Sequence, residues 1–239
     1  SFLCLQMPEK ELIYMADLIL FDLDGTLTDP EEGITNSVVH ALQTYGIQES
    51  PSRCRRFIGP PLGPELQAVY GVDPVESVLR FREYFERKGI YENKLYPDTV
   101  SVLKALREAG KTLVVATSKP KVYAERILDH FDLRQYIDGV FGATLDESKV
   151  LKSEIIADAL AAFETRPAIM VGDRLHDIQG AAENGIPSVG LLSGFGSRQE
   201  LESAGADYIR TSLTDALDLL LTAPEPQRAP EDGLNRSRT

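Results

Sequence analysis

The chain has 239 residues, of which 43% are hydrophobic and 26% are charged, and these values are ordinary for a globular protein. Its formal net charge of −12 argues against nucleic acid or an anionic membrane as the main partner. The two cysteines, Cys4 and Cys54, lack any metal-binding spacing, so reduced thiols in a cytoplasmic protein are expected. No apolar run approaches the length of a membrane span.

Short apolar runs alternate with helical patterns over most of the chain. Strands are predicted at 18–23, 112–116, 139–142, 168–171, 188–192 and 208–209. Helices are predicted at 98–109, 120–130, 149–163, 175–184, 198–204 and 213–221. Repeated β-then-α units imply a parallel sheet with helices on both faces. The predicted fold class is therefore α/β, with a three-layer Rossmann-like parallel sheet.

The segment after the first strand has a different pattern. A helix is predicted from Pro30 to Gly46, and residues 51–90 look helical apart from breaks at 59–64 and Gly71. No strand pattern appears between residues 29 and 96. The sequence therefore predicts a small all-helical cap domain, inserted after the first strand.

These patterns divide the chain into four parts. Residues 17–28 and 97–222 form the predicted core domain, and residues 29–96 form the helical cap. Residues 1–16 are a leader without an assigned role. Residues 223–239 carry three prolines and no aromatic residue, so a disordered tail is predicted there.

Two aspartates follow the first strand directly. Asp22 and Asp24 are two residues apart, so they point the same way from an extended chain, and Gly25 allows a sharp turn after them. Ligands of open parallel sheets bind beyond the carboxyl ends of the strands, where these carboxylates stand. Taken alone, the pair could also be two solvated aspartates in an ordinary turn.

Three more β/α boundaries carry polar side chains. Thr117-Ser118-Lys119 follows one strand, Asp173 follows another with Asp177 one helical turn later, and Lys152 stands at a helix start. In a parallel sheet these groups converge on the crevice that holds Asp22 and Asp24. Carboxylates without histidine or cysteine favour a hard cation, with Mg²⁺ the natural choice. Hydroxyl, backbone N–H and lysine groups are suited to phosphate oxygens.

This arrangement resembles the haloacid dehalogenase superfamily of hydrolases. Its four motifs occur in the family's order as Asp22-Leu23-Asp24-Gly25-Thr26, Thr117 after a strand, a lysine before a helix, and Gly172-Asp173-x-x-x-Asp177. The resemblance covers roughly residues 17–222. The nearest likeness is to the phosphoglycolate phosphatase and 5'-nucleotidase-like branch, supported by Phe57-Ile58-Gly59-Pro60-Pro61-Leu62 and by Val115-Ala116-Thr117-Ser118-Lys119-Pro120.

The resemblance implies a phosphatase with an aspartyl-phosphate intermediate. Asp22 would be the nucleophile, and Asp24 the general acid and base. Thr117, Ser118 and Lys152 would bind the phosphate, with Thr117 and Lys152 also stabilising the transition state. Mg²⁺ would be held by the Asp22 carboxylate, the Asp24 backbone carbonyl and Asp173, with Asp177 supporting the metal and Lys152. An aspartate at position 24 favours phosphoryl transfer over carbon–halogen cleavage.

The sequence is compatible with several alternatives. Lys149 could replace Lys152 as the phosphate lysine, and Ser118 could replace Thr117. The expected substrate is a small phosphate ester, either a 5'-nucleotide or 2-phosphoglycolate. A phosphomutase, a protein tyrosine phosphatase and a non-catalytic binding module are the other hypotheses. Either a monomer or a homodimer is compatible with the sequence.

Overall fold

The structure of the protein is a computed structural model, which describes residues 16–59, 61–146, 148–163 and 167–222. The predicted disordered tail at 223–239 and nearly all of the predicted leader lie outside the described residues. The last leader residue, Ala16, is only 3% exposed and packs in the main hydrophobic cluster. Its carbonyl also accepts a hydrogen bond from the Lys111 ammonium at 3.0 Å.

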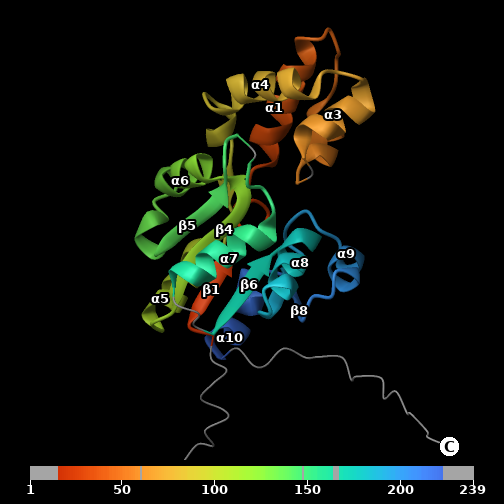
Figure 1. Cartoon of the computed structure of the whole chain (residues 1–239). Helices are drawn as coiled ribbons and strands as arrows, with labels where there is room; N and C mark the ends of the chain where they lie inside the picture. The colour runs from red at the N-terminus through yellow and green to blue at the C-terminus, as the bar shows by residue number, and fades with distance from the viewer. Residues whose placement is uncertain (1–15, 60, 147, 164–166, 223–239) are drawn as a thin grey trace, which may run out of the picture.

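A six-stranded sheet with the order β5-β4-β1-β6-β7-β8 forms the centre of the molecule (Figure 1). Its strands are β1 (Leu18–Phe21), β4 (Thr112–Pro120), β5 (Gly139–Ala143), β6 (Ala168–Gly172), β7 (Ser188–Leu191) and β8 (Tyr208–Arg210). Every neighbouring pair is parallel, which confirms the predicted α/β fold class. The central β1 lies between β4 and β6, and Phe21 is in register with Val115 and Val171.

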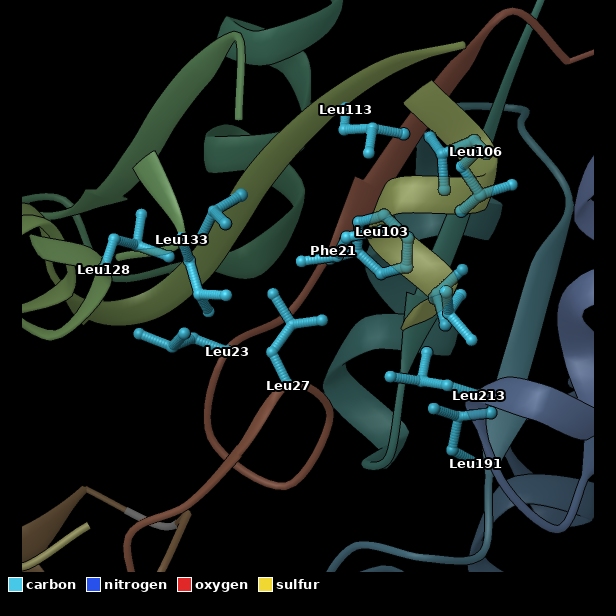
Figure 2. Close-up of a cluster of buried hydrophobic side chains, with 14 of the residues drawn as sticks. Phe21, Leu23, Leu27, Leu103, Leu106, Leu113, Leu128, Leu133, Leu191 and Leu213 are labelled. Atoms are coloured by element: carbon cyan, nitrogen blue, oxygen red, sulfur yellow. The ribbon is translucent and has the colours of Figure 1, made fainter. Parts of the chain in front are cut away.

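Helices cover both faces of this sheet because β1 is apolar on both sides. Ile19 and Phe21 belong to one buried cluster, whereas Leu18 and Leu20 belong to another. The first cluster includes residues of α5 (Thr99–Glu108), α6 (Lys121–His130) and α10 (Leu213–Thr222). The second includes residues of α7 (Lys152–Ala162) and α8 (Leu175–Glu183), and α9 (Arg198–Ser203) lies beside α8. Figure 2 shows Phe21 among the leucines of the first cluster.

A group of helices stands beyond one end of the sheet (Figure 1). It contains α1 (Glu31–Gln43), α2 (Pro51–Cys54), α3 (Leu62–Tyr70) and α4 (Pro74–Phe85), with 3-10 turns at Arg55–Phe57 and Gly89–Tyr91. These helices bury a cluster of their own, which includes Val38, Leu42, Phe57, Leu66 and Val72. We call this group the cap, and Asp73 begins α4 by accepting hydrogen bonds from the backbone N–H groups of Val75 and Glu76.

The expectation of no strand between residues 29 and 96 is wrong. β2 (Thr28–Asp29) pairs antiparallel with β3 (Lys94–Leu95), and both lie where the chain passes between the sheet and the cap. Two residues per strand are too few to produce a visible alternation, so the sequence pattern does not reveal them. As a result, the outgoing and returning connections of the cap run side by side.

Several predicted boundaries also differ from the structure. β1 ends at Phe21 instead of residue 23, and α7 begins at Lys152 instead of residue 149, because Leu151 is extended. β4 runs to Pro120 instead of residue 116, because it continues to pair with β5 beyond Thr117. Within the described ranges, no helix has both the length and the apolar content needed to cross a membrane.

Candidate active site

Neighbouring strands of the sheet bring the predicted polar residues together. Asp22 follows β1 directly, Thr117 lies near the end of β4, and Asp173 follows β6 directly. The backbone N–H of Asp22 donates to the carbonyl of Val171 at 2.9 Å, which holds the first aspartate against the adjacent strand. All three side chains are buried. The carboxyl ends of β4, β1 and β6 therefore form one polar site, as parallel pairing requires.

Lys152 is the cation at the centre of this site. Its ammonium lies 2.9 Å from Asp22 Oδ1 and 2.7 Å from Asp177 Oδ1, and its side chain is only 4% exposed. It also donates to the Ala116 carbonyl at 3.0 Å. Burial opposes its charge, but the carboxylates of Asp177 and Asp22 outweigh burial and raise the pKa of Lys152. Lys149, by contrast, is 38% exposed and pairs with Asp158 at 2.6 Å.

Three buried carboxylates form an acidic cluster beside Lys152. One carboxylate oxygen each from Asp22, Asp173 and Asp177 lies within 4.8 Å of the others. Burial raises the pKa of Asp173 well above its usual range, and the neighbouring Asp177 and Asp22 charges add to this effect. Burial likewise raises the pKa of Asp177 to about 6, with Lys152 acting in the opposite direction. Such a cluster is costly to ionise without a cation, so it is suited to hold one.

The donor set of the cluster matches a divalent metal ion. Asp173 Oδ1 is buried and has no hydrogen-bond partner among the described residues, whereas Asp173 Oδ2 accepts from the backbone N–H of Phe195 at 2.7 Å. Asp177 Oδ2 accepts from the Arg174 backbone N–H at 3.0 Å, and this bond orients the carboxylate at the start of α8. The atoms that the cluster offers as metal ligands are all carboxylate oxygens, which Mg²⁺ prefers. The acidic cluster can therefore bind a metal.

Glycines allow the backbone to close around these carboxylates. A Cβ atom at Gly25 or at Gly194 would lie 2.3 Å from Asp173 Oδ2, and one at Gly172 would lie 2.2 Å from Asp177 Cγ. Gly25 also has a φ of +86°, which other residues rarely adopt. The sequence predicts the turn at Gly25, but it gives no sign that the loop holding Gly194 and Phe195 encloses Asp173. Only the packing reveals that contact.

Asp24 faces a different partner from the acidic cluster. Its Oδ2 lies 2.5 Å from the ammonium of Lys119, and its Oδ1 is buried with no hydrogen-bond partner among the described residues. Burial raises the pKa of Asp24, and the Lys119 charge opposes that shift. The sequence points to Thr117-Ser118-Lys119 as a strand-end group, yet it gives Lys119 no role. In the structure the Lys119 ammonium contacts the carboxylate of Asp24, the predicted acid and base.

A cavity of about 250 Å³ separates the cap from the carboxylates. Its floor is lined by Asp22, Asp24, Thr117, Ser118, Lys119, Lys152 and Asp177. Its cap side is mainly apolar, with Ile34, Phe57, Ile58, Leu62, Val78, Phe81 and Phe85 together with Arg82. The cavity is therefore polar where the carboxylates stand and apolar where the rest of a bound molecule would lie.

Direct contacts hold the cap against the core on two sides of this cavity. Arg174, next to Asp173, donates from Nη1 to the Ile58 carbonyl of the cap at 3.1 Å and from Nε to Glu200 at 2.8 Å. On the other side, Arg82 of α4 donates to the Leu145 carbonyl beyond β5 at 3.0 Å. The cap segment at Ile58 therefore touches Arg174, which follows Asp173 of the acidic cluster.

The chain matches known proteins over most of its length. Residues 19–191 match the family model of haloacid dehalogenase-like hydrolases. A 5'-nucleotidase of Pseudomonas aeruginosa is 44% identical over 191 residues, which cover 77% of this chain and 86% of the relative. The tyrosine-protein kinase PtkA of Mycobacterium tuberculosis is 36% identical over 201 residues, covering 82% of this chain and 69% of that protein.

A solved structure shows the same fold. The crystal structure of a predicted phosphatase from Clostridium acetobutylicum superposes with a TM-score of 0.82 at 41% identity, covering 87% of this chain and 99% of that one. The family match spans β1 to β7 and includes every carboxylate of the site. The chain therefore belongs to the haloacid dehalogenase-like hydrolase family, and it is a phosphoric monoester hydrolase.

Proposed function

We propose that this phosphatase hydrolyses small phosphomonoesters through a phosphorylated Asp22, with Mg²⁺ as its cofactor. The observation that carries the proposal is the buried pair of Asp22 and Lys152, 2.9 Å apart on the cavity floor, with Asp24 facing the same cavity. The pair offers a nucleophile and a cation for phosphate oxygens, and Asp24 offers a proton donor and acceptor.

Mg²⁺ fits the acidic cluster by the chemistry of its ligands. The Asp22 and Asp173 carboxylates and the Asp24 backbone carbonyl would hold the ion, and Asp177 would support it and Lys152. When bound, the ion offsets the repulsion between an anionic nucleophile and an anionic phosphate ester. Thr117 and Lys152 would bind the transferring phosphoryl oxygens beside it.

Two steps account for hydrolysis. In the first, an Asp22 oxygen forms a bond to phosphorus, and the bond from phosphorus to the leaving oxygen breaks. The leaving oxygen keeps the electron pair and takes a proton from the Asp24 carboxyl. In the second, water attacks phosphorus and gives its proton to the Asp24 carboxylate, while the electron pair of the broken bond returns to Asp22. Free phosphate and the starting enzyme result.

The cap side of the cavity supports a 5'-nucleotide as the preferred substrate. Seven apolar cap residues line the cavity, and they would cover the flat face of a nucleobase better than the two-carbon acid of 2-phosphoglycolate. The name of the Pseudomonas aeruginosa relative, 5'-nucleotidase, points the same way. Phosphomutase and protein tyrosine phosphatase activities are the alternatives. The absence of nucleic-acid and membrane partners, a cytoplasmic location and a monomeric or homodimeric state remain predictions.

A phosphate-release screen tests this proposal. Purified protein with Mg²⁺ is assayed on 5'-nucleotides, sugar phosphates, 2-phosphoglycolate and a phosphotyrosine peptide, and product analysis separates free phosphate from isomerised ester. We expect release from nucleotides and a loss of roughly 1000-fold or more in Asp22→Asn. Full activity of a folded Asp22→Asn variant would refute the covalent mechanism.

A further inference from the structure

Lys119 of β4 has a side chain with little exposure to solvent. Its ammonium lies 2.5 Å from Asp24 Oδ2, and its side chain is only 8% exposed. The same ammonium lies 4.8 Å from the centre of the Phe85 ring, at the last residue of α4 in the cap. Lys119 therefore contacts the predicted acid and base on one side and the cap on the other.

A bulge in β4 produces this placement. Thr117 pairs with Gly142 and Pro120 pairs with Ala143, so Ser118 and Lys119 are two extra residues between adjacent positions of β5. The Lys119 backbone N–H donates to Thr117 Oγ1 at 3.2 Å, which fixes the bulge from within. A Cβ atom at Gly142 would lie 2.7 Å from the Lys119 carbonyl, so the bulge packs tightly on β5. Bulges near active sites commonly redirect a side chain in this way.

The contacts of the two Asp24 oxygens are unequal. Oδ2 is occupied by Lys119, whereas Oδ1 is buried and has no hydrogen-bond partner among the described residues. A carboxyl that exchanges protons with a leaving oxygen and then with water needs one free oxygen and a fixed orientation. The contact with Lys119 provides the orientation, and it leaves Oδ1 available for proton transfer.

We propose that Lys119 is a positioning residue that holds Asp24 Oδ2, so that Oδ1 transfers the proton, and that Phe85 of the cap completes this contact. The inference rests on the proposed function, in which Asp24 is the acid and base. In the first step Oδ1 gives its proton to the leaving oxygen as the phosphorus–oxygen bond breaks. In the second step Oδ1 takes a proton from water, and Lys119 donates to Oδ2 throughout.

The cap contact adds a consequence for specificity. The Phe85 ring stacks on Phe81 at a centroid distance of 5.3 Å and meets the Tyr123 ring of α6 edge-on at 5.4 Å. Phe85 is thus held by residues of both the cap and the core, and its face is presented to the Lys119 ammonium. A cap in this position places the lysine against Asp24, so proton transfer is favoured while the cap covers the substrate.

Leaving-group dependence tests the role of Lys119. Single-turnover release of the leaving group is measured with excess enzyme and Mg²⁺, using a 5'-nucleotide and 4-nitrophenyl phosphate as substrates. An alkyl leaving oxygen needs a proton from Asp24, whereas 4-nitrophenolate leaves readily without one. In Lys119→Met we expect a loss of about 100-fold for the nucleotide and less than about fivefold for the nitrophenyl ester.

Matched variants separate positioning from charge and from folding. Lys119→Met keeps most of the apolar stem below Phe85, and Lys119→Arg, which keeps the charge, should recover part of the loss. Lys121→Met removes an exposed lysine two residues away that does not line the cavity, and it should match the wild type. Phe85→Leu should show the same substrate-dependent loss at a smaller size, roughly fivefold.

Three outcomes would overturn the inference. Equal losses on both esters with a lowered unfolding midpoint would assign Lys119 a structural role. A raised KM with unchanged kcat would make Lys119 a ligand of the substrate phosphate. Wild-type activity retained in Lys119→Met on both esters would show that Asp24 needs no such partner. If the wild type itself releases nothing from any ester, the proposed function fails first, and this inference fails with it.

Discussion

Removing divalent cations should make the stability of this protein fall as the pH rises through the weakly acidic range. The reason lies in the acidic cluster, where Asp22, Asp173 and Asp177 are buried within 4.8 Å of one another. A chelated protein must ionise these groups close together and away from water. The effect can be measured on Asp177, whose side chain has an isosteric uncharged replacement in asparagine.

The size and sign of the change in unfolding free energy with pH follow from the pKa of Asp177. Burial, together with the charge of Asp22, raises this pKa from 3.8 to about 6 in the folded protein. The folded state therefore holds the proton more tightly than the unfolded chain. The resulting stabilisation is complete below the unfolded pKa and is lost as the pH rises through the folded pKa. The total loss is about 3 kcal/mol, of which about 1 kcal/mol falls between pH 5 and pH 7.

Urea unfolding of the wild type and Asp177→Asn with a chelator measures this effect. The asparagine does not titrate, so the difference between the two unfolding free energies reports the titration of Asp177 together with the neighbours whose charges it affects. We expect the wild type to lose about 1 kcal/mol relative to the variant between pH 5 and pH 7. Mg²⁺ at pH 7 should restore the wild type more than the variant. The reasoning would be refuted if the difference in unfolding free energy between wild type and Asp177→Asn stayed constant with pH. It would also be refuted if the wild type gained stability relative to the variant as the pH rises.

Three other changes have definite expected outcomes. Lys152→Met should lower turnover at least about 100-fold and destabilise the fold by roughly 3 kcal/mol, because Asp22 and Asp177 lose their shared cation. Lys149→Met is the control, and equal phosphate release by both variants would contradict the assignment of Lys152 as the phosphate lysine. Replacing Mg²⁺ by Ca²⁺ should stop turnover, because Ca²⁺ accepts looser coordination; full activity in Ca²⁺ would count against the metal assignment. Arg174→Ala should raise KM by roughly tenfold, because it removes the charged hydrogen bond to the cap at Ile58; an unchanged KM would exclude that contact as a determinant of substrate binding.

The fold was largely predictable because its signals are local. Each strand of the sheet appears as an apolar run, and the runs of β1, β4 and β6 end near polar residues that line the cavity. Between Lys152 and Lys149, the spacing into the apolar residues Ile155 and Ile156 favours Lys152 because it fits the family pattern better, and the choice of phosphate lysine stays a prediction. In the structure Lys152 contacts Asp22, and Lys149 contacts Asp158 on the exposed side.

The parts that escaped prediction depend on contacts between distant segments. Lys119 and Asp24 are 95 positions apart, and their contact requires a bulge that the residue pattern of β4 does not encode. The Phe195 N–H reaches Asp173 through a loop whose sequence reads only as a turn. The β2–β3 pair is too short for any periodic signal. Each of these contacts depends on how distant segments pack together, and the hydrophobic pattern of the sequence does not specify that packing.

The glycines around the acidic cluster also bear on how this enzyme can change over evolution. Gly25, Gly172 and Gly194 carry no reactive group, yet a single added methyl at any of them would collide with Asp173 or Asp177. Cap residues such as Leu62 and Val78 line the cavity on the side where the leaving group of the proposed substrate would lie. A library of all single substitutions should therefore tolerate almost nothing at the glycines, while changes in the cap redirect substrate preference. We expect new substrates to be acquired through changes in the cap, while the backbone around the acidic cluster stays fixed.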